Sequence, residues 1–142
     1  MPSLEPPAYA IDVSRWPLVR LRATSAVDST AALDVTYRDL EQLLARRGRF
    51  LLLFDLRGAR SSPSRRRRLL DWGLAHESEL RALVGAMALV AGTSLERGFV
   101  TALLWLQPVP WPQRVFSSAS EAETWLMQEH HTSQMPTGSD AE

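Results

Sequence analysis

One run of residues restricts the fold more than any other. Residues 50–54 read Phe-Leu-Leu-Leu-Phe, with no polar residue at alternate positions. A strand that faces solvent on one side alternates apolar and polar residues, whereas a strand covered on both faces of a parallel sheet is apolar throughout. Residues 85–92, Gly-Ala-Met-Ala-Leu-Val-Ala-Gly, have the same character. We therefore expect a parallel sheet covered by helices.

The segments around these two strands show helical spacing. Four apolar residues that precede the first strand recur at i, i+4, i+7 and i+11, which predicts one face of an amphipathic helix. These residues are Leu33, Tyr37, Leu40 and Leu44. Gly48 follows where a left-handed helix cap belongs. Ser62 and Pro63 are typical of a helix start and predict a second helix over residues 62–84, in which Gly73 permits close packing.

The remaining elements complete an alternating order. Residues 9–21 alternate apolar and polar residues around a break at Ser14–Pro17 and predict an antiparallel hairpin. Thr93 and Glu96 form a capping box for a third helix that stops before Pro108. A short strand at 113–118 and a helix capped by Ser120 follow. The predicted order is ββαβαβαβα, an α/β fold with crossovers between parallel strands.

Length and composition favour one soluble domain. The chain has 142 residues, no cysteine and a formal net charge of zero, which argues against a nucleic-acid or membrane-surface binder. No apolar run reaches the roughly 18 residues of a membrane span, and the N-terminus does not resemble a signal peptide. We expect a cytoplasmic protein with a flexible arm at 1–7, a domain at 8–129 and a disordered polar tail at 130–142.

Three stretches, 49–59, 84–106 and 108–126, together with the N-terminal hairpin, resemble the STAS superfamily, specifically its SpoIIAA-like (STAS/SEC14-type) branch. The resemblance implies a mostly parallel sheet of four to five strands, with an antiparallel N-terminal hairpin and helices mainly on one face. It also implies a regulatory role rather than catalysis. In the anti-sigma-factor antagonists of this family, a serine in an Asp-Ser-Ser-Gly motif is phosphorylated to control partner binding. Ser61 and Ser62 occupy the matching place, but the local text Ala-Arg-Ser-Ser-Pro-Ser lacks the motif.

The same region carries an unusual number of cations for a helix start. A helix N-terminus disfavours cations and favours anions, so a phosphate, a phosphoserine or an acidic partner surface would suit this place. The candidate residues for a phosphorylation or anion site are Ser61, Ser62, Ser64, Arg57, Arg60, Arg65 and Arg66. The alternative is structural: Asp55 ends a strand, Gly58 makes a turn, Ser62 caps the helix, and consecutive arginines point in different directions into solvent.

The third helix is apolar on nearly every side. Leu95, Phe99 and Leu103 belong to a predicted core stripe, while other apolar residues lie off it. Such a helix is either fully buried or presents a contact surface, for self-association or for an apolar ligand. The candidate residues for this surface are Phe99, Val100, Leu104, Trp105 and Trp111.

Catalytic motifs are scarce. The chain has no nucleophile elbow, phosphate-binding glycine loop or metal-ligand spacing, so we expect no enzyme activity, no metal and no cofactor. The first hypothesis is a regulatory module that docks a protein, such as a regulatory kinase or anti-sigma-like protein, through the arginine-rich start of the second helix. The alternative is a SEC14-like carrier or sensor of a lipid or other apolar molecule near residues 95–111.

Overall fold

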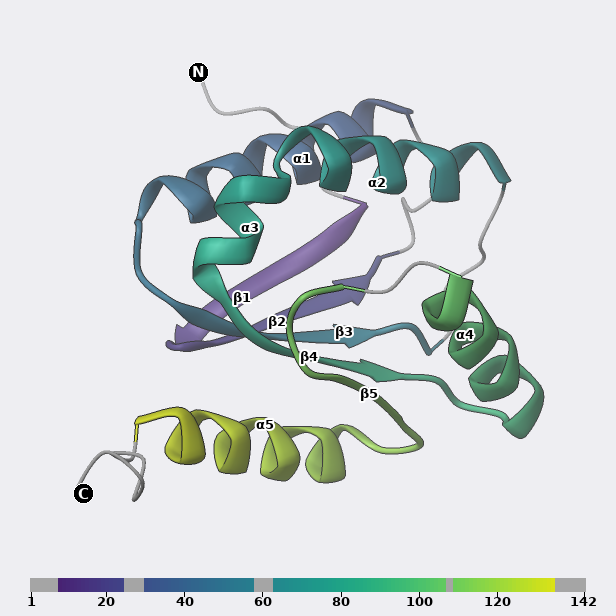
Figure 1. Ribbon diagram of the computed structural model, residues 1–142. Coiled ribbons are helices and arrows are strands. Elements are labelled where there is room, and N and C mark those ends of the chain that lie inside the picture. Colours follow the sequence, from purple (N-terminus) through teal and green to yellow (C-terminus); the bar gives the residue numbers. More distant parts are fainter. Residues whose placement is uncertain (1–7, 25–29, 58–62, 107–108, 135–142) are drawn as a thin grey trace.

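The strands of the sheet lie side by side in the order in which the chain makes them. A computed structural model describes residues 8–24, 30–57, 63–106 and 109–134. The sheet order is β1-β2-β3-β4-β5, with β1 antiparallel to β2 and the other neighbours parallel (Figure 1). The bounds are β1 Tyr9–Arg15, β2 Leu18–Ala23, β3 Phe50–Asp55, β4 Val84–Val90 and β5 Gln113–Phe116. The predicted architecture, with its antiparallel hairpin and its two central apolar strands, is confirmed.

The helices lie on both faces, with more of them on one. They are α1 Thr30–Ala45, α2 Pro63–Ala75, α3 Glu77–Leu83, α4 Ser94–Leu106 and α5 Ala119–Gln134. The helices α1, α2 and α3 lie over one face, whereas α5 lies under the other (Figure 1). Crossovers between parallel strands are right-handed. When successive strands are added in one direction along the sheet, the crossover helices therefore lie on the same face. The last helix follows the edge strand β5 and returns beneath β3 and β4.

Two cores result, one on each face of the sheet. The α1-side core is formed chiefly by α1, β2 and the ends of β3, α3 and β4, and Tyr9, Ile11 and Val13 of β1 pack against it. It includes the complete predicted stripe Leu33, Tyr37, Leu40 and Leu44. The α5-side core consists of Leu18, Leu51, Leu53, Ala86, Ala88, Val90, Ala122 and Leu126. Alternate residues of β3 and β4 enter opposite cores, which explains why these strands are apolar throughout.

The predicted second helix is two helices. It begins at Pro63 as expected, but α2 ends at Ala75 and α3 starts at Glu77, because the chain turns at His76 to descend to the sheet (Figure 1). His76 fixes this corner: its ring stacks on Trp72 with 4.3 Å between centroids, and its Nδ1 lies 2.9 Å from the Trp72 carbonyl oxygen. Gly73 does not serve close packing, since a Cβ there would meet no described atom within 4 Å.

Two predicted caps are also corrected. The left-handed residue after α1 is Arg47, with φ of 61°, and not Gly48. Gly48 instead lies close to Trp16, because a Cβ there would be 3.0 Å from Cζ2 of that ring. The cap of α5 is Ser118, whose Oγ accepts a hydrogen bond from the Glu121 backbone N–H at 3.2 Å; Ser120 lies inside the helix. Helix α5 continues past residue 129 to Gln134, two residues before Pro136, where a helix is disfavoured.

Candidate functional site

The carboxyl end of β3 carries an ion pair whose carboxylate is buried. Asp55 is only 3% exposed, and Arg57 holds both of its oxygens: Nε donates to Oδ1 at 2.9 Å and Nη2 donates to Oδ2 at 2.7 Å. The Arg57 backbone N–H also donates to Oδ1, at 3.1 Å. These hydrogen bonds lower the pKa of Asp55 from its ordinary value, although burial alone would raise it. The Arg57 guanidinium is therefore already committed to a carboxylate of its own chain.

The side chains of the other predicted anion-site residues lie outside the described part of the chain. Arg60, Ser61 and Ser62 lie outside the described residues, and so do the side chains of Ser64, Arg65 and Arg66, whose backbone forms the first turn of α2. Two later arginines of the run have structural partners. Arg67 pairs with Asp71 at 3.2 Å within α2. Arg68 reaches Asp34 of α1 at 2.6 Å and lies over the Tyr37 ring, so it joins the two helices.

The start of α4 adjoins the Asp55–Arg57 pair. A Cβ placed on Gly92 would lie 3.6 Å from Cγ of Arg57 and 3.8 Å from Oε2 of Glu96. The predicted cap forms here: the Glu96 backbone N–H donates to Oγ1 of Thr93 at 3.1 Å, while Oε2 of Glu96 accepts from the Gly92 backbone N–H at 3.2 Å. The two hydrogen bonds of Glu96, one from its backbone and one to its side chain, are thus both made with residues just before α4.

The orientation of α4 differs in part from the sequence-based expectation, because Phe99 and Trp105 of the candidate contact surface are exposed, whereas Val100 and Leu104 are half-buried. Leu95 and Phe99, assigned to the core stripe, are 85% and 51% exposed, and Trp105 is 83% exposed. Among the residues of α4 whose side chains are described, Arg97, Val100, Thr101 and Leu104 are half-buried. Leu95, Gly98, Phe99, Ala102 and Trp105 therefore form one outward apolar face, which we name the α4 surface.

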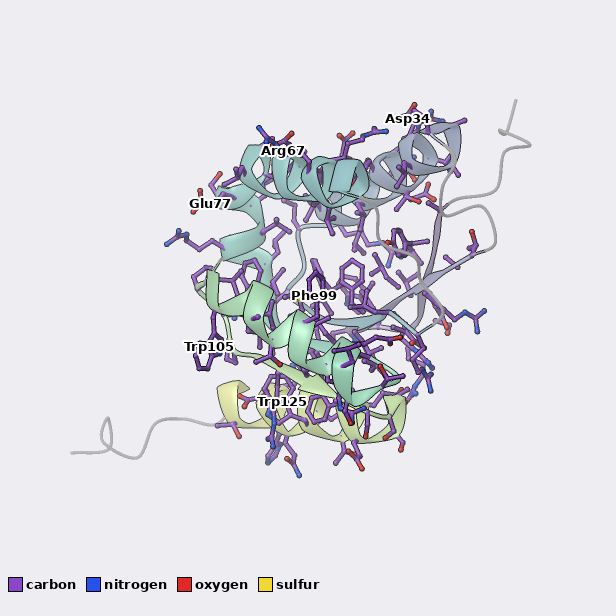
Figure 2. All side chains as sticks on the ribbon, turned by 90° about the vertical axis from the view of Figure 1, so that its right-hand side faces the viewer. Asp34, Arg67, Glu77, Phe99, Trp105 and Trp125 are labelled. Atoms are coloured by element: carbon purple, nitrogen blue, oxygen red, sulfur yellow. The ribbon has the colours of Figure 1, made fainter. Side chains whose placement is uncertain are left out.

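The position of α4 explains this exposure. It connects β4 to the edge strand β5 and contacts the sheet mainly through β5, so no further strand lies beneath its outer side. Figure 2 looks onto α4, which lies between α1 and α2 above and α5 below, with Phe99 near its middle and Trp105 at its C-terminal end. The arginine-rich start of α2 and the start of α4 both follow the carboxyl ends of neighbouring parallel strands. These two features share one end of the sheet.

Trp111 belongs to another part of the molecule. It is half-buried against the α1-side core and does not extend the α4 surface. Its indole Nε1 is buried without a hydrogen-bond partner among the described residues, as are Nε1 of Trp72 and Oε1 of Gln113. Gln113 pairs with Met87 on the α1 side of the sheet, and Trp72 packs against the same core. Three orphaned polar atoms therefore lie on one side of the sheet.

Other kinds of site find little support in the described part of the chain. No three histidine or carboxylate side chains among those residues come together to hold a metal ion. None of the described helices is long and apolar enough to cross a membrane. A shallow hollow of about 680 Å³ lies along α5, lined by Arg15, Glu123, Met127 and His131 among others, and contains none of the predicted site residues.

Comparison with known proteins identifies the fold. No protein-family profile matches the chain, and no curated protein sequence does. Its structure is similar to the crystal structure of an uncharacterized protein of the DUF3478 family from Shewanella loihica PV-4, described as having a SpoIIAA-like fold. The TM-score is 0.56 with 17% sequence identity, over 89% of this chain and 98% of that chain. The SpoIIAA-like fold predicted from the sequence is therefore confirmed.

Proposed function

We propose that the chain is a non-catalytic regulatory module that docks another protein through the α4 surface. One observation carries the proposal: Leu95, Phe99 and Trp105 expose most of their apolar area on a single helix face. An aromatic-rich apolar face on an otherwise packed protein is typical of a protein contact, because water leaves it favourably when a partner covers it. Tryptophan in particular is enriched among the residues that dominate binding energy.

The arginine-rich start of α2 supplies a second, electrostatic contribution. Arg57, Arg67 and Arg68 are paired with carboxylates of the same chain, and we assign the contact with an acidic partner to the neighbouring Arg65 and Arg66. Since α2 and α4 start at the same end of the sheet, a partner with acidic residues beside an apolar patch would suit both features. Phosphorylation of Ser61, Ser62 or Ser64 would reverse the local charge and weaken that attraction.

A capture experiment tests the docking surface. A tagged chain, expressed in the organism that encodes it, is compared with the variant Phe99→Glu/Trp105→Glu and with the control Leu74→Glu. Leu74 is 63% exposed on α2 and supplies a matched apolar site away from α4. We expect captured proteins to be lost from the α4 variant and kept by the control. Equal capture by all three chains would contradict the proposal.

A contribution from the arginines has its own test. In the variant Arg65→Glu/Arg66→Glu we expect weaker capture that recovers little at low salt, because the favourable charge has been reversed. The control Arg81→Glu changes an exposed cation on α3, which pairs with Glu77. If both variants capture alike, the electrostatic contribution is absent while the α4 surface remains.

A second candidate function rests on a different observation. The orphaned atoms Nε1 of Trp72, Nε1 of Trp111 and Oε1 of Gln113 supply two donors and one acceptor in apolar surroundings on one side of the sheet. An apolar molecule with a polar group, carried or sensed on this side of the sheet, would satisfy those of the three atoms that it reaches. Native mass spectrometry of the purified protein should then show a bound mass, reduced in Trp111→Phe, which removes the N–H but keeps an aromatic ring. A mass equal to that of the bare chain would reject this candidate.

A further inference from the structure

The spacing and charge of the α4 surface indicate what covers it. We infer that its partner is the α4 surface of a second copy of this chain, packed antiparallel about a two-fold axis. The inference rests on the proposed function, since it names the protein that docks there. Three independent features of α4 support it: the positions of its outward residues, the absence of free charge on that face, and a glycine that the fold itself does not explain.

The outward residues have the spacing of a helix-pair seam. Leu95, Gly98, Ala102 and Trp105 occur at i, i+3, i+7 and i+10, which are the a, d, a and d positions of a heptad. Phe99, at an e position, flanks this seam and widens the outward face on one side. Residues 95 to 105 span about 15 Å along the axis at 1.5 Å per residue. The α4 surface is thus shaped for one helix crossing it at a small angle.

The same positions are symmetric about residue 100. In an antiparallel pair an a position of one helix faces a d position of the other. Leu95 then meets the partner's Trp105, and Gly98 meets the partner's Ala102, so large residues contact large ones at the ends and small residues meet at the centre. A two-fold interface requires that contact i to j be matched by contact j to i, and this register satisfies that condition.

Gly98 is difficult to explain within the single chain. Glycine in a helix interior costs about 1 kcal/mol relative to alanine. A Cβ at Gly98 would meet no described atom within 4 Å, so no neighbour in the chain requires its absence. A close approach by another backbone does require it, because only glycine leaves room there. The pair Gly98 and Ala102 lets the two helices approach closely where they cross.

Electrostatics permit contact between like surfaces. The two charged residues of α4 are both hydrogen-bonded at the start of the helix: Glu96 accepts from the Gly92 N–H, and Arg97 donates to the Ala91 carbonyl oxygen and to Oγ of Ser94, each at 3.2 Å. Both keep their charges, but neither belongs to the α4 surface, whose residues are all uncharged. The chain as a whole carries no net charge, so two copies approach without long-range repulsion. A strongly charged partner would find nothing complementary on this face.

Sedimentation velocity over a range of concentrations measures the association. A single helix pair buries less than the roughly 1,200 Å² of a standard interface, so we expect a dimer that dissociates on dilution. Trp105→Ala should raise the dimer dissociation constant at least about tenfold, as loss of a central aromatic anchor does. Leu74→Ala, at the exposed site on α2, should leave it unchanged. Circular dichroism confirms that each variant is folded.

The variant Gly98→Leu distinguishes a specific helix pair from non-specific association of apolar surfaces. The substitution adds apolar area to the α4 surface, so non-specific association would become tighter. A close crossing at Gly98 would instead be blocked, and we expect the dissociation constant to rise at least about tenfold. Tighter or equal association in Gly98→Leu would overturn the inference.

The register is tested with cysteines, since the chain has none of its own. Chains with Leu95→Cys and chains with Trp105→Cys, which leave Gly98 in place, are mixed in a glutathione redox buffer at a concentration high enough for Trp105→Ala to dimerise. If the register is antiparallel, disulfides between one chain of each variant should outnumber disulfides between two chains of the same variant. A parallel helix pair would favour disulfides between two chains of the same variant. In denaturant, where the dimer is absent, the different disulfide-linked pairs should form in the proportions expected for random pairing. A statistical mixture under native conditions contradicts the register.

The outcomes separate this inference from the proposed function. If the wild-type chain sediments as a monomer at every concentration, the second-copy partner is rejected. The docking surface then stands or falls by the capture experiment, in which Phe99→Glu/Trp105→Glu would still lose a different protein. If the chain dimerises but Trp105→Ala and Gly98→Leu have no effect, the dimer lies elsewhere and the inference is again rejected.

Discussion

The Arg57 guanidinium donates two hydrogen bonds to the carboxylate of Asp55, from Nε to Oδ1 at 2.9 Å and from Nη2 to Oδ2 at 2.7 Å. The carboxylate is buried at the end of the central strand β3, while the guanidinium remains about half exposed. A buried carboxylate needs such partners, because without them its charge would be costly to keep away from water. The pair thus fixes the turn that leaves the sheet toward α2.

The first prediction concerns this pair. Arg57→Gln should lower the free energy of unfolding by about 1–3 kcal/mol at neutral pH, because it leaves the Asp55 carboxylate buried without its cation. The folded-state pKa of Asp55 lies below 3.8, so the stabilisation is complete above that value and is lost as the pH falls through the lower folded-state pKa. Urea unfolding of wild type and variant at neutral pH and near pH 3 measures the difference. The control Arg81→Gln breaks an exposed i,i+4 pair and should cost no more than about 0.5 kcal/mol. A gap between wild type and Arg57→Gln that is the same at both pH values would contradict this account.

A second prediction compares two glycines. Gly48→Ala should destabilise the protein by about 1 kcal/mol, since its Cβ would press on Trp16, whose ring also packs on Phe50 with 6.0 Å between centroids. Gly73→Ala should stabilise it by about 0.5–1 kcal/mol, because alanine is a better helix former and its Cβ enters open space. Thermal unfolding measures both. A neutral or stabilising shift in Gly48→Ala would contradict the effect assigned to the contact with Trp16.

Adjacent residues of α5 give a third prediction. Leu126 is completely buried in the α5-side core, whereas Met127 is 42% exposed. Leu126→Ala should cost about 2–5 kcal/mol through lost burial and a cavity. Met127→Ala should stay within about 0.5 kcal/mol. Chemical denaturation of both variants checks the packing face of α5, and similar losses would mean that α5 is rotated relative to the sheet.

The fourth prediction concerns the cap of α5. Ser118→Ala should cost about 1 kcal/mol, because Oγ of Ser118 satisfies the Glu121 backbone N–H. Ser120→Ala should have little effect, since Ser120 lies within the first turn and alanine is favoured in helices. Thermal unfolding of the two variants compares them directly. A larger loss at Ser120 would restore the cap that the sequence alone suggested.

The sequence predicted the elements whose burial leaves a periodic trace. The two central strands are recognisable because both of their faces are covered, and α1 is recognisable because one face alone is buried. Pro63 marks the start of α2, where its missing N–H costs nothing. The hairpin follows from the alternation of Tyr9, Ile11 and Val13, all of which pack against the α1-side core. In each case the local pattern and the tertiary environment agree.

The sequence failed where the environment decides between equivalent patterns. Helix α4 is apolar on nearly every side, so periodicity cannot tell whether Phe99 or Val100 faces the sheet. Its place at the edge strand settles this, and that place is a property of the whole topology. The turn at His76 is also invisible locally, because residues 62–84 all suit a helix. The ion pair between Arg57 and Asp55 depends on a side-chain conformation that the spacing of residues in the sequence does not predict.

The α5-side core has a consequence for how the chain is made. Residues of β2, β3 and β4 that face this side find their covering helix only in Ala119–Gln134. During synthesis, therefore, the emerging sheet presents a bare apolar face until α5 has left the ribosomal exit tunnel, although the helices of the opposite face are already available. We expect chaperones to bind the nascent chain at this face until then, because transiently exposed apolar surface promotes aggregation. If translation stops before α5 is made, the α5-side face of the sheet stays uncovered, and we expect the released chain to aggregate.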